Sequence, residues 1–529
     1  MFDRMTQINS SEITDVVIIG SGVGGLCCAA MLAKYGFQTI VCESHSLPGG
    51  AAHSFEKKGY KFDSGPSLYS GLSASPSNNP LRQVLDAIEE DLEWVNYDVW
   101  GCRLPEGDFD AYVGADSFCE VLLRLRGQDA VNQWLKLQAE MKPLAEAVNA
   151  IPSMAMRFDL GAGISLAKYL PSSLWHLPNI LRLTGAFSKI MDGIVEDEFV
   201  HNWLDLLCFL LSGLPASGTV AAEMAFMFAE WYQPEVKLDY PVGGSGAIVD
   251  ALVRGLTKRG GKILYNAHVD RILVENKRAV GVRLKDGREI KAKTAVVSNA
   301  STWDTLPLLP QGTLPQSFIT EREATPECES FMHLHLGIDG ANLPEDLQCH
   351  YIIVNDWKKG VTAPQNVVVV SIPSVLDPSL APVGKHTIHV YTPGNEPYTL
   401  WQGMDRRSPE YIQQKQARAE IMWQGLERII PDIRDRAEVT LVGTPLTHQR
   451  FLRRHHGSYG PGIVAGKGLF PGSTTPLSGL LCCGDSTFPG IGIPAVAASG
   501  AIAANTIAPI NKHLEMLATV PYPPKLINY

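Results

Sequence analysis

The first strong hydrophobic pattern in the chain is an unbroken apolar run, residues 15–20 (DVVIIG), which ends in a cluster of glycines. An apolar run without polar alternation is typical of a parallel strand that is buried on both faces. Residues 26–35 combine small and apolar side chains, which predicts a helix closed by Gly36. A second apolar run, residues 38–42 (QTIVC), predicts the neighbouring strand. The chain therefore opens with a strand–turn–helix–strand unit.

From residue 81 to residue 240 the hydrophobic pattern is helical. Segments 80–93 and 130–150 have apolar positions at helical spacing and charged outer faces. Two long apolar tracts follow at 162–194 and 199–232, and prolines and glycines break them into short helices. These tracts form either the core of a helical lobe or a surface that enters a lipid layer. The first tract has the composition of a helix lying on a membrane, because basic residues stand among its apolar ones: Lys168, His176, Arg182 and Lys189.

The second half of the chain returns to strand patterns. Glycines at 243–246 precede a predicted helix, 247–259, and a short strand, 262–264. Residues 266–300 then alternate with a period of two through a turn at Asp286 and Gly287. This pattern predicts a β-meander whose last strand, 295–298, is buried. We expect that strand to join the same sheet as the first one.

Two further alternating segments, 331–340 and 366–393, predict an antiparallel sheet that forms the floor of a cavity. His333 and His335 would point to the same face of that sheet, so they are candidate metal ligands. No carboxylate or cysteine stands at metal-ligand spacing from them, which favours two buried, hydrogen-bonded histidines instead. We therefore predict no metal site.

A basic segment lies near the end of the chain at 447–462 (THQRFLRRHHGSYGPG), where His448 and residues 450–456 carry its charge. One interpretation is a solvated helix end. The alternative is a contact with an anion, either a lipid headgroup or a pyrophosphate.

Composition narrows the class of protein. The 529 residues exceed a typical domain, which predicts at least two lobes. The formal net charge of −10 argues against a nucleic-acid partner. None of the ten cysteines forms a CxxC pair, so zinc spacing is absent, and a reducing, cytoplasmic-type compartment is expected. The sequence contains no run of eighteen apolar residues, so no membrane span is predicted.

The first glycine cluster fits a dinucleotide-binding turn. Gly20, Gly22 and Gly25 match G-x-G-x-x-G, with Gly24 between them, and Glu43 follows about 20 residues later. Gly20 permits the tight turn, Gly22 lets the backbone approach a pyrophosphate, and Gly25 lets the helix pack on the strand. The helix N-terminus favours the negative phosphate. Glu43 would accept hydrogen bonds from a ribose diol.

The continuation favours FAD over NAD. Gly49 and Gly50 follow Glu43 almost at once, in the sequence Leu47-Pro48-Gly49-Gly50, and another glycine-containing segment occupies 61–67. In an NAD-binding domain, the next helix would follow at this point of the chain. A long cofactor tracked by backbone glycines fits FAD better, and we predict FAD as the cofactor. Val269 stands where an FAD-binding strand commonly contacts the adenine with its backbone.

A second turn of the same kind lies at residues 480–507. An apolar strand, 479–483, leads to Gly484 and Asp485, and a helix of small residues is expected from Ala495. Asp485 would bind the ribitol, and the helix N-terminus would face the pyrimidine side of the flavin. We interpret the two turns as the two ends of one FAD site. The residues of the second turn assigned to it are Gly484, Asp485, Gly490, Gly492 and Ile493.

Several motifs resemble one family. They are the first turn with Glu43, LPGG at 47–50, YKFDSGPS at 60–67, PVGGSGAIVDAL at 241–252, SIPSVLDPSLAPVGKHT at 371–387 and GDSTFPGIGIPAVAASG at 484–500. Together they resemble the FAD-dependent carotenoid oxidoreductases, a group of phytoene desaturases, carotenoid (prolycopene) isomerases, FAD-type ketolases and retinol saturases. The resemblance extends over residues 14–508. It implies an α/β fold with a Rossmann-like FAD-binding lobe of the amine-oxidase type and a discontinuous α+β substrate lobe.

The resemblance also implies a division of the chain. We expect a discontinuous FAD lobe (14–80, 241–310 and 441–510), a helical substrate lobe that faces the membrane (81–240), a sheet lobe (311–440) and a tail (511–529). Flavin amine oxidases usually have an arginine after the double glycine. Ala51, Ala52 and His53 stand there in this chain, as in the isomerase and desaturase branch.

The function implied is flavin-dependent isomerisation or desaturation of a long apolar polyene, a C40 carotenoid. Another flavin oxidoreductase (ketolase, isoprenoid saturase or amine oxidase) and a non-catalytic carrier of apolar ligands stay open. Flavin carries the redox chemistry, so few polar residues are needed and no catalytic residue is assigned. Asp63 and Tyr69 are the polar residues nearest to the expected flavin face. A substrate dissolved in lipid predicts peripheral membrane association, and the sequence predicts no oligomeric state.

Overall fold

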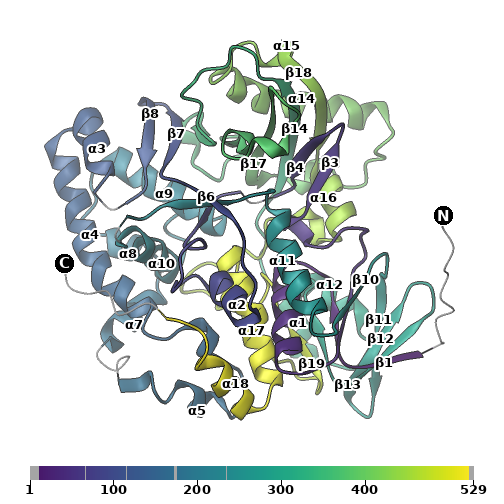
Figure 1. Ribbon diagram of the computed structural model, residues 1–529. Helices are drawn as coiled ribbons and strands as arrows, with labels where there is room; N and C mark the ends of the chain where they lie inside the picture. The colour runs from purple at the N-terminus through teal and green to yellow at the C-terminus, as the bar shows by residue number, and fades with distance from the viewer. Residues whose placement is uncertain (1–10, 66, 115, 172–175, 234, 523–529) are drawn as a thin grey trace.

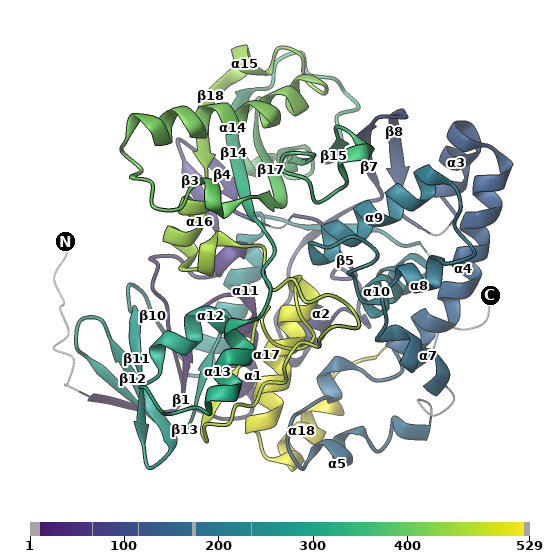
Figure 2. The ribbon, with the colours of Figure 1, turned by 180° about the vertical axis from the view of Figure 1, so that it is seen from behind.

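The computed structural model describes residues 11–65, 67–114, 116–171, 176–233 and 235–522. It has one large sheet at one end, a second large sheet at the other, and a helical part beside them (Figures 1 and 2). The predicted fold class, a Rossmann-like α/β lobe combined with an α+β lobe, is confirmed.

The first sheet contains the strand–turn–helix–strand unit predicted at the start of the chain. Its order is β10-β2-β1-β13-β12-β11, and β19 pairs with the end of β13. β10, β2, β1, β13 and β19 run parallel, and the β11–β12 hairpin is antiparallel. The strands are β1 (Ser11–Ile19), β2 (Thr39–Cys42), β10 (Lys262–Leu264), β11 (Val269–Glu275), β12 (Arg278–Leu284), β13 (Glu289–Ser298) and β19 (Leu480–Cys482).

Helices from distant parts of the sequence pack together in this lobe: α1 (Val23–Lys34), α11 (Gly246–Thr257) and α17 (Ile493–Ile507). Helices α1 and α17 approach closely because their facing residues are small. A Cβ added at Gly500 would lie 2.1 Å from the carbonyl oxygen of Gly24. This contact joins segments from near the two ends of the chain (Figure 1).

The second sheet has the order β18-β14-β17-β16-β15-β7-β8. Its strands are β7 (Val99–Leu104), β8 (Gly107–Tyr112), β14 (Ser330–Asp339), β15 (His350–Val354), β16 (Val367–Ser371), β17 (Lys385–Glu396) and β18 (Ala437–Gly443). Helix α14 (Pro409–Glu427) covers one face and packs on β14, β16 and β17. Apolar side chains of β14 to β17 and α14 form the core between them.

The helical part has an aromatic core. The rings of Phe118 and Trp203 stack with centroids 4.6 Å apart, and Trp134 contacts Phe118 from the side. Aromatic residues bury large areas and so fix the packing of these helices. The helices are α3 (Phe118–Arg126), α4 (Gln128–Val148), α5 (Ala162–Leu166), α7 (Leu177–Leu183), α8 (Ser188–Met191), α9 (Glu198–Ser212) and α10 (Ala221–Trp231).

Two small sheets connect the lobes, one of β3 with β4 and one of β5, β9 and β6. Their strands are β3 (Ser54–Lys57), β4 (Tyr60–Asp63), β5 (Tyr69–Ser70), β6 (Trp94–Tyr97) and β9 (Leu238–Pro241). The remaining helices are α2 (Pro80–Ile88), α12 (Thr302–Thr305), α13 (Gln316–Glu323), α15 (Ile433–Arg436), α16 (Pro445–Leu452) and α18 (Ile510–Leu517).

Some predicted boundaries differ from the structure. Helix α1 begins at Val23, three residues before the predicted start at Leu26, because Gly24 and Gly25 fit inside its first turn. Helix α17 begins at Ile493 and not at Ala495, with Pro494 in its first turn, a position that proline tolerates. The sequence does not predict strands β7 and β8. In the structure β7 pairs with β15 of the second sheet, and β8 pairs with β7 at the edge.

The described helices include none that combines the length and apolar character needed to cross a membrane. All ten cysteines are free, and eight of them are buried. The eight buried thiols lie in the interior of the protein.

Candidate cofactor site

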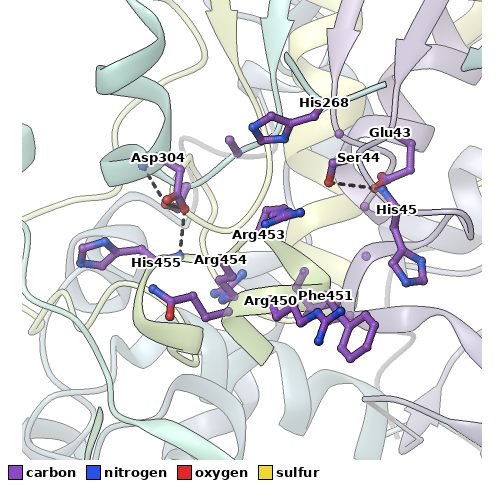
Figure 3. Close-up of a pocket in the computed structure, with 18 of the residues that line it drawn as sticks. Glu43, Ser44, His45, His268, Asp304, Arg450, Phe451, Arg453, Arg454 and His455 are labelled. Carbon is purple, nitrogen blue, oxygen red and sulfur yellow. Dashed lines mark hydrogen bonds between the residues drawn. The ribbon is translucent and has the colours of Figure 1, made fainter. Parts of the chain in front are cut away.

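A cavity of about 970 Å³ lies at the carboxyl ends of β1 and β2. One wall is the first glycine turn and the residues after β2. The opposite wall is the basic segment from α16 to residue 456 (Figure 3). Ligands of open parallel sheets bind at this edge, so the cavity stands where the sequence predicts a cofactor. The predicted site residues that line it are Gly20, Gly22, Glu43, Gly50, Val269 and Asp485.

The first turn has the geometry that the motif requires. Gly20 has a φ of +88°, which an L side chain rarely adopts. A Cβ added at Gly25 would lie 2.3 Å from the carbonyl oxygen of Gly20. Gly22 is the N-cap of α1 and offers no side-chain acceptor, so the first N–H groups of the helix can bind an anion.

The two glycine turns meet at one side chain, Asn299. A Cβ at Gly24 would lie 2.8 Å from its Oδ1 and 3.0 Å from the Cα of Gly484. Gly484 has a φ of +97°, and its own Cβ would lie 2.8 Å from the same oxygen. Asn299 directly follows β13, and its sequence neighbourhood indicates no role for it in the site. The structure places it between the turns, in the cavity wall.

Glu43 is buried at the end of β2. Its Oε2 accepts hydrogen bonds from the backbone N–H (2.9 Å) and the hydroxyl (2.5 Å) of Ser21, and its Oε1 accepts one from His45 N–H (2.7 Å). The carboxylate is thereby fixed at the edge of the cavity (Figure 3). A carboxylate has about four acceptor directions, so a fixed Glu43 can still accept from a ligand hydroxyl.

The double glycine packs against the first turn. Gly49 N–H donates to the carbonyl of Ser21 (2.9 Å), and a Cβ on Gly50 would lie 3.0 Å from the Cα of Gly22. Both glycines have positive φ, +111° and +56°. His53 follows, with its Nδ1 2.7 Å from the carbonyl oxygen of Gly50. Burial is the main cause that lowers the pKa of His53, so the imidazole is neutral at neutral pH.

The second turn reaches the cavity through Asp485, which pairs with Arg454. Gly490 and Gly492 follow with φ of +134° and +98°, and Gly492 is the N-cap of α17. Like Gly22, Gly492 leaves the first N–H groups of its helix without a side-chain acceptor. The predicted residues set back from the cavity lining are Gly24, Gly25, Gly49, Gly484, Gly490, Gly492 and Ile493.

The basic segment forms the opposite wall. Arg450, Arg453 and Arg454 come from the end of α16 and the turn after it, and Figure 3 shows Arg453 between Asp304 and Glu43. Arg453 has a φ of +52°, which is uncommon for a non-glycine residue. Burial, and next the Arg453 charge, lower the pKa of His268 across the cavity. Of the two sequence interpretations, this placement supports an anion contact inside the molecule.

The histidines of the second sheet form a stack. His333 Nδ1 lies 2.8 Å from His389 Nε2, and His333 Nε2 lies 2.6 Å from His448 Nε2. His335 lies on the same face as His333, as predicted, with its ring parallel to that of His389 at 4.3 Å. Burial lowers the pKa of all four, of His335 to about 4 and of His448 to about 3. They are therefore neutral, and they bond to one another and to the backbone.

Asp63 and Tyr69 are held by the structure around them. Asp63 accepts hydrogen bonds from Ser54 Oγ (2.7 Å), Tyr240 Oη (2.7 Å) and Ser245 N–H (2.9 Å). Tyr69 Oη donates to Ser245 Oγ at 2.7 Å. Both side chains are buried. Their hydrogen bonds to Ser245 connect β4 and β5 to the start of α11.

The parallel sheet, the glycine turn at its carboxyl edge and the second turn at α17 define a dinucleotide-binding fold. Residues 23–508 match the family described as flavin containing amine oxidoreductase, and the chain belongs to that family. A flavin-containing family implies FAD as the cofactor. The residues present fit it, because the cavity is lined by the first glycine turn, by the fixed Glu43 carboxylate and by Asp485 of the second turn.

The chain is similar in sequence to two relatives and in fold to a solved structure. The chain is 33% identical to prolycopene isomerase 1, chloroplastic, of an Oncidium hybrid cultivar over 95% of this chain and 85% of that protein. It is 25% identical to the neurosporene-forming phytoene desaturase of Rhodobacter capsulatus, over 94% and 95% of the two chains. The structure of putrescine oxidase bound to putrescine has the same fold, with a TM-score of 0.63, 15% identity and 94% and 99% coverage.

Proposed function

We propose that this protein is an FAD-dependent isomerase of a poly-cis C40 carotenoid. The observation that carries the proposal is 33% identity to prolycopene isomerases over nearly the whole chain, combined with Ala51 after the double glycine. Flavin amine oxidases usually have an arginine at that position. Desaturation is the second candidate, supported by the likeness to phytoene desaturases.

The chain would hold FAD along the cavity. The N-terminus of α1 would bind the pyrophosphate, Glu43 the adenosine ribose, and the backbone of Val269 the adenine. Asp485 would bind the ribitol, and the N-terminus of α17 would face the flavin ring. Arg450 and Arg453 on the opposite wall would add positive charge toward the pyrophosphate.

The flavin supplies electron and hydride transfer when it is bound. The protein contributes position and the exclusion of water. A long polyene needs apolar surroundings, and the helical part, which is rich in Leu, Met, Phe and Trp, is the part of the chain proposed to supply them. Isomerisation leaves the number of hydrogens unchanged, so it requires no net oxidant.

The test is a carotene assay with purified holoprotein. We expect poly-cis lycopene to be converted to the all-trans form, anaerobically and with reduced flavin, without change in mass. Phytoene is the control substrate. Formation of products with fewer hydrogens would favour the desaturase, whereas conversion of neither carotene would contradict the proposal.

We also propose that the edge formed by α5 and α7 contacts a membrane surface, since a carotenoid substrate dissolves in lipid. Apolar side chains are exposed there beside basic ones. Ile164, Leu177 and Leu181 have relative exposures of 57%, 50% and 68%, and Lys168 and Arg182 are exposed too. In Figures 1 and 2 both helices lie along the same edge of the molecule. Leu174 and Trp175, the other predicted contacts, lie outside the described residues.

Replacing Leu177 and Leu181 by glutamate should release the protein from vesicles that contain anionic lipid while FAD stays bound. Two buried leucine side chains contribute about 1.5–3 kcal/mol each on transfer from water, so binding should weaken at least about tenfold. Cosedimentation with liposomes measures this. The control adds the same charge elsewhere, at Leu123 and Ile412, which are 53% and 47% exposed. Equal cosedimentation of the two variants would contradict the assignment of this edge.

A further inference from the structure

Two histidines and a glutamate meet beside the cofactor cavity. Glu327 lies before β14, and His455 and His456 follow α16 and line the cavity. Nδ1 of His456 lies 2.9 Å from Oε1 of Glu327, and Nε2 of His455 lies 3.5 Å from its Oε2. One ligand atom from each residue lies within 4.8 Å of those of the other two. A carboxylate and two imidazoles therefore offer their ligand atoms at one place.

Backbone pairing between two distant segments brings these residues together. Glu327 forms an antiparallel bridge with Pro461, and Cys328 N–H donates to the carbonyl of Gly460 at 2.8 Å. This pairing places Glu327 opposite the turn after α16, although 129 positions separate it from His456 in the sequence. Spacing along the chain does not reveal such a group.

Both imidazole rings are held by neighbouring aromatic residues. The ring of His455 stacks on Trp303 with centroids 4.8 Å apart, and the ring of His456 stacks on Tyr398 at 4.2 Å. The backbone N–H of His455 also donates to Oδ2 of Asp304 at 2.9 Å (Figure 3). Ligands that are already positioned in this way lose little conformational freedom when they bind.

The distances and the donor types fit a transition-metal cation. Zinc binds imidazole nitrogen and carboxylate oxygen at about 2.0–2.2 Å, so the ligand atoms of a tetrahedral site lie about 3.3 Å apart. The two nitrogen-to-oxygen distances, 2.9 and 3.5 Å, lie on either side of that value. Two histidines and one glutamate leave the fourth position of zinc to water. Mg²⁺ and Ca²⁺ prefer oxygen ligands, so a pair of imidazoles selects against them.

The charges around the group admit a cation. Arg454, the arginine next to the two histidines, pairs with Asp485, and its guanidinium also donates to the carbonyl of Tyr459 (2.6 Å). Asp304 adds a second carboxylate on the His455 side. An exposed ion pair between one histidine and Glu327 would by itself contribute little to stability. A second imidazole at the same carboxylate completes a set of three ligands.

We propose that Glu327, His455 and His456 bind one divalent transition-metal cation, with zinc as the expected metal. The proposal does not depend on the isomerase function. It differs from the sequence-based prediction of no metal site, which considered only His333 and His335. The bound cation joins the segment before β14 to the wall of the cofactor cavity. It stabilises the folded chain, because the three ligands meet only after folding.

The test is a calorimetric titration of the full-length, FAD-bound protein with ZnCl2 after treatment with a chelator. We expect one zinc site per chain that depends on Glu327, and a higher Tm when zinc is bound. Excess Mg²⁺ should not displace the zinc. Glu327→Gln removes one of three direct ligands while the protein keeps its FAD. Loss of an outer-shell partner already weakens metal binding 10- to 100-fold, so E327Q should weaken it at least about 100-fold.

Asp205→Asn is the matched control. Asp205 faces His201 at 3.5 Å on α9, so this variant also turns a carboxylate beside a histidine into an amide. Within the described part of the chain that pair belongs to no group of three ligands. D205N should bind zinc like the parent and show the same rise in Tm. His456→Ala, a second change at the proposed site, should lose the zinc as E327Q does.

A parent protein that binds no zinc, or that releases it to Mg²⁺, would overturn this inference. Parent affinity in E327Q, or an equal loss in D205N, would place the zinc elsewhere and overturn it too. These measurements use no carotene. A protein that binds zinc at Glu327 but isomerises no carotene would contradict the proposed function alone.

Discussion

Replacing Gly25 by alanine is expected to leave the purified protein without bound FAD. The new Cβ would lie 2.3 Å from the carbonyl oxygen of Gly20 and 3.1 Å from Cβ of Asn299. The first obstacle is backbone, so no side-chain rotation can relieve it, and α1 must move away from the turn. Such overpacking costs about 1–3 kcal/mol, and here it falls on the proposed pyrophosphate site. Affinity for FAD should fall about 10- to 100-fold.

The measurement is the ratio of flavin to protein absorbance, followed by fluorescence titration of the apoprotein with FAD. Gly163→Ala is the matched control, because a Cβ there meets no atom within 4 Å and the residue is exposed in α5. The control should bind FAD like the parent. If G25A also binds it with the parent's Kd, the first turn does not hold the pyrophosphate.

Replacing Asp485 by alanine should weaken FAD binding as well, from the other end of the site. Asp485 lines the cavity and pairs with Arg454. A hydrogen bond to a charged group contributes about 1.5–3 kcal/mol, which corresponds to roughly 10- to 100-fold in Kd. Asp485→Asn keeps an acceptor oxygen, so its affinity for FAD should fall less than that of the alanine variant.

Asp485→Ala also removes the contribution of the Asp485–Arg454 ion pair to folding stability. The control therefore removes a carboxylate from another arginine pair. Asp432→Ala breaks the pair of Asp432 with Arg436 at α15, far from the cavity. Thermal unfolding of both variants shows how much stability each pair contributes. An Asp485→Ala protein that stays yellow and titrates like the parent would mean that this turn is purely structural.

The sequence predicts those parts of the fold that depend on local patterns. The run before Gly20, the glycines themselves and the alternation of 266–300 each specify backbone geometry within a few residues. These local patterns therefore predict the parallel sheet and place both turns on the same lobe. The same-face placement of His333 and His335 also follows from a local rule, the two-residue period of a strand.

Other parts depend on contacts between distant segments. Nothing near Asn299 in the sequence indicates that it stands between two turns, and β7 reveals its partner only in the folded chain. His389 and His448 join His333 from other strands and helices.

The central claim is that the two glycine turns hold the two ends of one FAD. The most direct test is the flavin stoichiometry of the purified holoprotein, measured by releasing the flavin and comparing its absorbance with the protein concentration. The account predicts one FAD per chain, and it predicts that Gly25→Ala and Asp485→Ala each release that same molecule. Two flavins per chain, or a single flavin lost from only one of the variants, would contradict it.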